Sequence, residues 1–264
     1  MPRMVMSAFW DFQVPLPPLP EQRRIAAILD QADALRAKRR EALAQLDSLA
    51  QSIFIDMFGD PVTNSKGWPL QSISELPIQI ADGNYSSKYP SASEFVTDGI
   101  PFIRANNLNN LTVSIHDMRF ISPEKHKELA KGHLRTNDVL LVTRGEIGKV
   151  GIVPPEFEDA NINAQLVLLR PKNKSIQSSF LCHLFDDPRM NAYVRSFETG
   201  VALKQLPIHS LKRILLPLPP VALQTQFSVI TEQLQKSRKT LSMSSSALDA
   251  LFTSLQHRAF QGEL

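Results

Sequence analysis

One segment occurs twice in this chain, and an internal repeat constrains the fold more than any other feature of the sequence. Val14-Pro15-Leu16-Pro17-Pro18 has its counterpart in Leu216-Pro217-Leu218-Pro219-Pro220. With the Pro-Leu-Pro-Pro blocks aligned, about forty following residues align without a gap. Nine positions after the first block are identical in the second copy: Gln22, Ile28, Gln31, Arg36, Leu46, Asp47, Leu49, Ser52 and Phe58, at Gln224, Ile230, Gln233, Arg238, Leu248, Asp249, Leu251, Ser254 and Phe260. The two copies are therefore expected to form the same structure.

Each copy also carries apolar residues with a period of seven. In the first copy the two columns are Ile25, Ala32, Arg39, Leu46, Ile53 and Ile28, Leu35, Ala42, Leu49, Asp56. In the second copy they are Phe227, Leu234, Leu241, Leu248, Leu255 and Ile230, Ser237, Ser244, Leu251, Arg258. So narrow a stripe is typical of a long helix that buries a seam against another helix. The two copies are the obvious partners.

Proline and glycine mark the ends of both helices. A proline-rich run leads into each one, and Pro20 with Glu21 suits a first helical turn, which tolerates a missing N–H and favours negative charge. Gly59 and Gly262 are suitable stops. We expect helices over residues 21–59 and 223–260, with lead-ins over 1–20 and 216–222.

Composition excludes several classes of protein. At 43% hydrophobic and 21% charged residues, the chain can bury a core and is not disordered. The single Cys182 excludes a disulfide framework or a cysteine-rich zinc site, and it lies among apolar residues as a core thiol would. No apolar run is long enough for a membrane span and no secretory signal is visible, which predicts a cytoplasmic protein. A net charge of +3 permits a DNA partner without arguing for one.

A different pattern fills residues 60–215. Short β-type runs over 100–104, 139–143 and 164–169 alternate with Gly, Asn, Asp and Pro turns. Short helices are expected over 122–129, 176–185 and 189–197. The fold class is thus α+β: one globular domain flanked by two long helices that pair as an antiparallel coiled coil.

Motifs for catalysis are missing. There is no Asn-Pro-Pro-Tyr or Asp-Pro-Pro-Tyr methyltransferase tetrapeptide, no His-Glu-x-x-His helix, and no histidine cluster at metal-ligand spacing. The run Gly145-Glu146-Ile147-Gly148-Lys149 has the wrong glycine spacing for a phosphate loop, and Val150 stands where Ser or Thr would hold magnesium. Glu146 and Lys149 also lack an upstream Pro-Asp partner for a nuclease site. We predict neither catalytic nor metal-binding residues.

The order of these elements resembles the DNA specificity (S) subunit of type I restriction-modification systems. The resemblance is carried by the proline-rich lead-ins, the helix ending near Phe-Gly, the Gly99–Arg104 run, the stretch from Asn137 to Gly148, and the terminal Arg258–Leu264. It covers nearly the whole chain. It implies a target recognition domain that reads one half of a bipartite DNA site, with paired helices that fix the distance between the halves.

The resemblance also implies partners and their cofactors. A methyltransferase subunit using S-adenosylmethionine would dock on the chain, a restriction subunit using ATP and magnesium would join, and the chain itself would bind no cofactor. A whole subunit has two recognition domains, whereas residues 1–14 resemble only the tail of a first one, with Ala8–Phe12 matching Ser210–Ile214. The chain is either a truncated remnant or a half subunit that pairs with a second copy. The sequence leaves both open, along with the base sequence recognised.

Four loops offer candidates for DNA contact: 83–88, 104–110, 143–149 and 199–205. Arg and Lys read guanine and Asn and Gln read adenine, while basic and hydroxyl groups hold phosphates. The candidate DNA-binding residues are Asn84, Tyr85, Ser86, Lys88, Arg104, Asn106, Asn107, Arg144, Lys149, Lys204 and Gln205. Each one could instead be a solvated loop residue or a turn former. Two other functions stay open: a coiled-coil scaffold that binds protein, and a nuclease or methyltransferase whose site has escaped detection.

Overall fold

The computed structural model describes residues 16–85, 88–201 and 203–264. The predicted tail of a preceding domain in residues 1–14 lies outside this range. Contacts divide the chain into two units. A helical unit comprises the described residues up to Leu49 and Gln233–Leu264, and an α+β unit comprises Ala50–Glu232. No helix in the described ranges is long and apolar enough to cross a membrane.

The two long helices are α2, Leu19–Phe58, and α7, Val221–Gln261. The described residues between them along the chain form three sheets, four short α-helices and three 3-10 turns. The strands are β1 Leu70–Ser72, β2 Ile78–Asp82, β3 Phe95–Val96, β4 Ile100–Ile103, β5 Leu108–Asn109, β6 Thr112–Val113, β7 Arg119–Ile121, β8 Val139–Val142, β9 Val150–Ile152, β10 Asn161–Ile162, β11 Leu166–Pro171 and β12 Leu215–Pro217. The short helices are α3 Pro123–Glu128, α4 Ser178–Asp186, α5 Pro188–Arg195 and α6 Ile208–Leu211, and the 3-10 turns are η1 Ala92–Glu94, η2 Ala105–Asn107 and η3 Pro155–Phe157.

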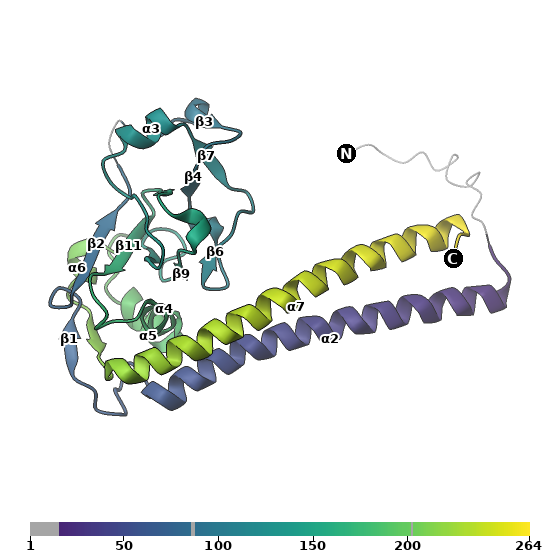
Figure 1. The fold of residues 1–264 in the computed structure, drawn as a ribbon, viewed down its shortest axis with the longest axis horizontal. Coiled ribbons are helices and arrows are strands. Elements are labelled where there is room, and N and C mark those ends of the chain that lie inside the picture. The colour runs from purple at the N-terminus through teal and green to yellow at the C-terminus, as the bar shows by residue number, and fades with distance from the viewer. Residues whose placement is uncertain (1–15, 86–87, 202) are drawn as a thin grey trace. The chain divides into compact units, whose positions relative to one another are not determined.

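In the helical unit the two copies of the repeat run antiparallel (Figure 1). Arg36 Nε donates to Asp249 Oδ1 at 2.6 Å. Arg238 forms an ion pair with Asp47. These four residues are two identical pairs of the repeat, so each copy gives its arginine to the aspartate of the other. The repeat thus builds a pseudo-twofold helix pair, which confirms the predicted antiparallel coiled coil.

The seam of this coil differs from the prediction in one column. The first column is correct, since Ala32 is 8% exposed and Leu46 is partly buried. In the second column Leu35 is 52% and Leu251 50% exposed. Ile28, Ala42, Ile230 and Ser244 of this column are partly buried. The residues one position later also turn inward: Leu29, Arg36, Leu43 and Ala50 on α2, and Thr231, Arg238, Ser245 and Phe252 on α7. The arginines fit there because their aliphatic stems pack and their guanidinium groups reach the facing aspartates.

A charge placed in the correct column should open the coil. We expect Leu46→Glu to cost about 1–3 kcal/mol, because a carboxylate would be placed in the apolar seam without a partner. Leu35→Glu is the matched control, since it makes the same change at a side chain that is already half exposed. Far-UV circular dichroism during thermal unfolding measures both. Equal losses for the two variants would show that the seam is wrongly assigned.

The largest sheet of the α+β unit has the strand order β2-β11-β8-β9-β6-β5. Its centre is antiparallel, with β11 between β2 and β8. A second sheet has the order β10-β4-β7-β3, and β1 pairs with β12 in a third. The predicted strands over 100–104, 139–143 and 164–169 are confirmed as β4, β8 and β11, and the predicted short helices as α3, α4 and α5.

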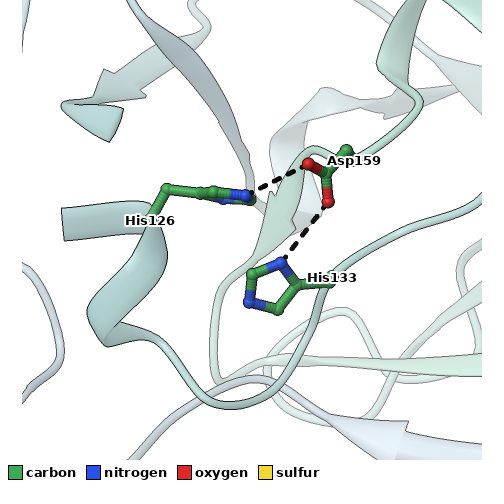
Figure 2. Close-up of side chains that lie close together, drawn as sticks. All are labelled: His126, His133 and Asp159. Carbon is green, nitrogen blue, oxygen red and sulfur yellow. Dashed lines mark hydrogen bonds and ion pairs between the residues drawn. The ribbon is translucent and has the colours of Figure 1, made fainter. Parts of the chain in front are cut away.

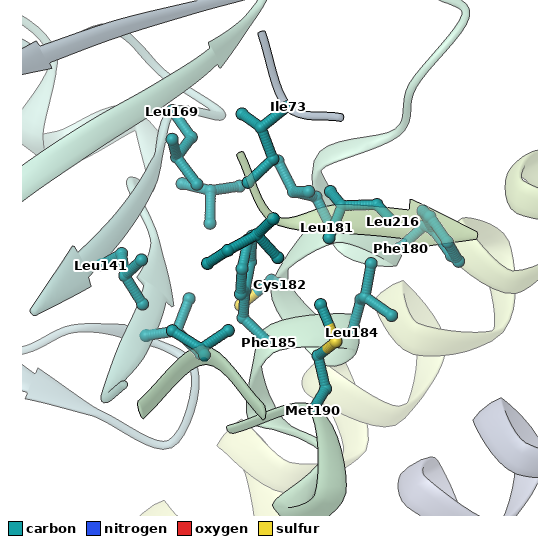
Figure 3. Packing of buried hydrophobic residues seen from close by; sticks show 14 of the residues in the cluster. Ile73, Leu141, Leu169, Phe180, Leu181, Cys182, Leu184, Phe185, Met190 and Leu216 are labelled. Carbon is teal, nitrogen blue, oxygen red and sulfur yellow. The ribbon is translucent and has the colours of Figure 1, made fainter. Parts of the chain in front are cut away.

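Strands β8 and β11 are buried on both faces, which explains their unbroken apolar runs. Val139, Leu141, Val167 and Leu169 face a core built with α4 and α5. Leu140, Val142, Leu166 and Leu168 face a second core. Figure 3 shows the first core, where Cys182 lies between the helices and the sheet. Burial raises the pKa of the Cys182 thiol well above its usual range, as expected for a core thiol.

The C-terminal end of α2 belongs to this first core. Phe58 packs against Phe180 and Phe227, with ring centroids 4.9 and 5.2 Å apart. The Phe58 carbonyl accepts a hydrogen bond from Trp68 Nε1 at 2.8 Å. Gly59 then ends the helix at φ +79°, and a Cβ there would lie 2.5 Å from Ser65 Oγ. The helix end and the domain are therefore folded together within the α+β unit.

Candidate nucleic-acid interface

Two predicted loops leave the large sheet at the same edge. In the register of the sheet, Asp82 at the end of β2 lies opposite Val167, and Val142 at the end of β8 lies opposite Leu166. Both partners stand at the start of β11. Because β2 and β8 run in the same direction on either side of β11, loops 83–88 and 143–149 begin next to each other.

Arg144 joins these two loops. Its guanidinium carbon lies 4.5 Å from the centroid of the Tyr85 ring. Both side chains are exposed, Tyr85 to 47%. Burial of part of the ring raises the pKa of the Tyr85 hydroxyl, and the positive charge of Arg144 acts against this rise. A guanidinium stacked on an aromatic face keeps its N–H donors available at the ring edge.

The hairpin 199–205 lies beside Arg144. Leu206 N donates to Thr143 O at 2.9 Å, and Gln205 forms β-bridges with Arg144 and Thr199. Gly200 closes the turn at φ +94°, where a Cβ would come within 2.4 Å of Leu203 O. The structure thus brings together Tyr85, Arg144 and Gln205 from three of the four predicted loops.

The fourth loop starts at the same edge but uses its polar groups internally. Asn163 N donates to Ile103 O at 2.9 Å, which ties the end of β4 to the segment before β11. Arg104 Nη2 then donates to Asp117 Oδ2 at 2.9 Å, and Asn106 Nδ2 donates to the same oxygen at 2.8 Å. Arg104 and Asn106 are therefore already paired with a carboxylate.

Two predicted asparagines are structural. Asn84 is 9% exposed, and its Nδ2 donates to Lys131 O at 2.9 Å. Asn107 is fully buried, accepts from Arg104 N at 3.0 Å and donates to His116 O at 3.0 Å. Both amides satisfy backbone groups inside the domain, as buried polar groups must. Their amides are therefore engaged inside the domain, and their predicted role as DNA contacts is not part of the interface proposed below.

The lysines of the prediction stand at the surface. Lys149 pairs with Glu146 at 3.2 Å, and Lys204, 62% exposed, pairs with Glu198 at 3.5 Å. The Lys149–Glu146 pair is solvent-exposed and contributes little to stability, so a phosphate can replace that carboxylate. The Glu198 side chain is only 7% exposed and also pairs with Arg195, so it keeps a partner when Lys204 turns to a phosphate. Lys88 is exposed and belongs to the loop of Tyr85. Ser86 lies outside the described residues.

Three further residues lie at this edge that the sequence pattern did not single out: Gln165, Val201 and Leu203. Gln165 is exposed just before β11, and its backbone carbonyl accepts from Thr143 N at 2.8 Å. The apolar residues that follow Gln165 predict a strand there, and this pattern conceals an exposed polar side chain. At the hairpin tip Val201 is 99% and Leu203 88% exposed. Two apolar residues in a polar turn beside Lys204 and Gln205 are the sequence signal for Val201 and Leu203, because exposed apolar side chains often mark binding surfaces.

Comparison with known proteins now decides the family. The family model for the type I restriction modification DNA specificity domain matches residues 1–45 and 78–243, well over half of the chain. The chain belongs to this specificity-domain family. The membership confirms the resemblance predicted from the sequence. The family is one of DNA specificity domains, so the interpretation as a DNA recognition protein is confirmed, and the scaffold alternative gains no support.

Relatives of the specificity-domain family match nearly all of the chain. The EcoBI specificity subunit of Escherichia coli is 26% identical, over 96% of this chain and 59% of its own length. The HsdS subunit from Thermoanaerobacter tengcongensis is similar in structure with a TM-score of 0.52 at 22% identity, over 100% of this chain and 64% of its own. The S subunit from M. genitalium has a TM-score of 0.57 at 15% identity, over 92% and 61%. The chain spans about three fifths of the length of these relatives.

Proposed function

We propose that this chain reads DNA sequence through the edge formed by Tyr85, Arg144 and Gln205, as part of a type I restriction-modification complex. The observation that carries the proposal is the Arg144–Tyr85 pair, 4.5 Å apart, which joins two converging loops of a specificity-domain family member. Arginine is the commonest reader of guanine and glutamine reads adenine, both in the major groove. Gln165 adds a second amide at the same edge.

The three loops that carry Tyr85, Arg144 and Gln205 also carry lysines and exposed apolar side chains. Lys88, Lys149 and Lys204 would hold phosphates and so fix the register of the domain on the duplex, without reading bases. Val201 and Leu203 at the hairpin tip would contact thymine methyl groups or a base step. The edge thus offers separate groups for positioning and for readout.

The helical unit has the properties of a rigid spacer between two readers. Its two helices exchange equivalent ion pairs, and Phe260, the repeat counterpart of the buried Phe58, is 78% exposed at the opposite end of the repeat. A second recognition domain would cover such an end, supplied by a second copy of this chain or by a longer polypeptide. A methyltransferase subunit carrying S-adenosylmethionine, and a restriction subunit with ATP and magnesium, would complete a cytoplasmic complex.

Selection from a randomised duplex library tests the readout. The chain is incubated with the library together with its methyltransferase subunit, and bound DNA is sequenced over several rounds. We expect one enriched motif, interrupted and symmetric if two copies assemble. Enrichment of no motif by an assembled complex would favour the coiled-coil scaffold.

A further inference from the structure

Away from the loop edge, two histidines and an aspartate meet (Figure 2). His126 lies on α3, His133 follows α3, and Asp159 stands in the turn before β10. His126 Nε2 is 3.3 Å from Asp159 Oδ2, and His133 Nδ1 is 3.5 Å from Asp159 Oδ1. One atom from each residue lies within 4.8 Å of the other two. The histidine spacing in the sequence did not reveal this group, because the third member is 26 residues further on.

Each ring has an inner nitrogen that faces Asp159 and an outer nitrogen that faces away from it. The partner of the outer nitrogen indicates where the proton of a neutral ring lies. His133 Nε2 lies 2.5 Å from the carbonyl oxygen of Leu129, which can only accept, so this nitrogen carries the proton. His126 Nδ1 contacts Asn161 Oδ1, another acceptor. In neutral rings the inner nitrogens then hold lone pairs. Two lone pairs face one carboxylate, and such an arrangement of acceptors calls for a cation between them.

The distances suit a transition metal. Zinc binds imidazole nitrogen and carboxylate oxygen at about 2.0–2.1 Å, which in a tetrahedron separates neighbouring ligand atoms by about 3.3 Å. Each ring faces its own oxygen of Asp159 at about this separation, Oδ2 at 3.3 Å from His126 Nε2 and Oδ1 at 3.5 Å from His133 Nδ1, so a small rotation of the carboxylate would turn one oxygen toward both rings. Metal-binding histidines also donate their other N–H to a carbonyl or similar acceptor, and the outer nitrogen of each ring contacts such an oxygen here, Leu129 O for His133 and Asn161 Oδ1 for His126. The cluster therefore has inner and outer contacts of the kind found in zinc sites.

The backbone holds the ligands in place. Asp159 N donates to Leu134 O at 3.0 Å and Leu134 N to Ala160 O at 2.9 Å. Asp159 adopts φ +60°, an uncommon value for a residue other than glycine. His126 is 11% exposed and Asp159 69%, so the site is anchored in the domain and open on the aspartate side.

We propose that His126, His133 and Asp159 bind one divalent transition-metal ion, zinc in the first instance, with water in the fourth position. Two imidazoles with one carboxylate favour zinc and similar metals over magnesium or calcium. The ion would join α3 to the turn before β10. That segment also supports the recognition edge, since Lys131 O, two residues from His133, accepts from Asn84 beside Tyr85. The metal is then a structural support for the loop, and its binding does not depend on DNA.

Zinc titration of the chelator-treated full chain tests the site without DNA. We expect one zinc ion per chain to bind tightly in competition with a chromophoric chelator, and zinc to raise the Tm. Asp159→Asn should weaken binding at least tenfold. This variant keeps the shape of an exposed side chain, so it should fold, which circular dichroism verifies. His116→Ala removes an exposed histidine outside the cluster and should leave the affinity unchanged.

Two results would overturn the proposal. One is a folded chain that binds no zinc, as expected if protons occupy the inner nitrogens or if the Asn161 amide is turned and donates to His126. The other is zinc binding that Asp159→Asn and His116→Ala affect equally, which would place the ion elsewhere. Neither result depends on whether the chain reads DNA.

Discussion

Phe58→Ala is expected to destabilise the α+β unit by about 3–5 kcal/mol, because it empties a filled core position. Phe58 is 3% exposed and its ring touches those of Phe54, Phe180 and Phe227 at centroid distances of 4.9–5.2 Å. This loss of unfolding free energy combines the transfer free energy of the deleted ring with the cost of the cavity that it leaves. Chemical denaturation monitored by tryptophan fluorescence measures this loss of stability, since Trp68 donates a hydrogen bond to the carbonyl of Phe58.

The repeat supplies a matched control at Phe260. It is the same residue type at the equivalent position of the second copy, yet it is 78% exposed. Phe260→Ala should therefore change the free energy of unfolding by less than about 0.5 kcal/mol. Comparable losses of stability in the two variants would mean that Phe260 is buried against another surface as Phe58 is, for instance that of a second copy. Dilution would then separate the cases, because only an intermolecular contact depends on concentration.

Arg144→Ala should weaken binding to the selected DNA by about 1–3 kcal/mol, roughly tenfold or more, and relax specificity at one base pair. The residue combines an exposed guanidinium with a rigid stacking partner in Tyr85. Tyr85→Phe keeps the ring and should keep most of the affinity, whereas Tyr85→Leu should lose part of it. Fluorescence anisotropy with the selected duplex and single-base variants measures both affinity and specificity.

Arg213→Ala removes the same charge elsewhere in the unit. Arg213 is exposed between α6 and β12, and Ser74 N donates to the neighbouring Lys212 O, next to the segment that leads into β2. It therefore lies toward the end of the sheet opposite the recognition loops. A small loss that is uniform across sequences is expected. If both arginine variants lost affinity equally without relaxed specificity, Arg144 would be a phosphate contact and not a base reader.

The repeat predicted most of the architecture because it fixes both helices and their pairing. Arg36 and Asp47 are among the residues that the second copy repeats, as Arg238 and Asp249. Only the structure shows that each arginine pairs with the aspartate of the other copy. The second seam column was wrong at positions such as Leu35, because the apolar pattern favours Leu35 over the neighbouring Arg36. An arginine whose stem is apolar can occupy a seam position that a hydrophobicity pattern assigns to its neighbour.

The candidate site was predictable as a set of loops, though not residue by residue. Order along the chain places the loops after strands, and the register then brings them to one edge. Asn84 and Asn107 look like Arg144 and Gln205 in the sequence, since all are polar loop residues. What separates them is burial, because a buried amide must satisfy backbone groups nearby. Asp159 joins two histidines only through the fold, so no spacing could indicate that cluster.

Mapping methylated adenines tests the central claim most directly. The chain is combined with its methyltransferase subunit and S-adenosylmethionine on genomic DNA, and modified bases are located by single-molecule sequencing. We predict methylation confined to one interrupted motif, which Arg144→Ala relaxes at a single position. Methylated adenines that share no flanking sequence would contradict the claim that this chain selects the DNA.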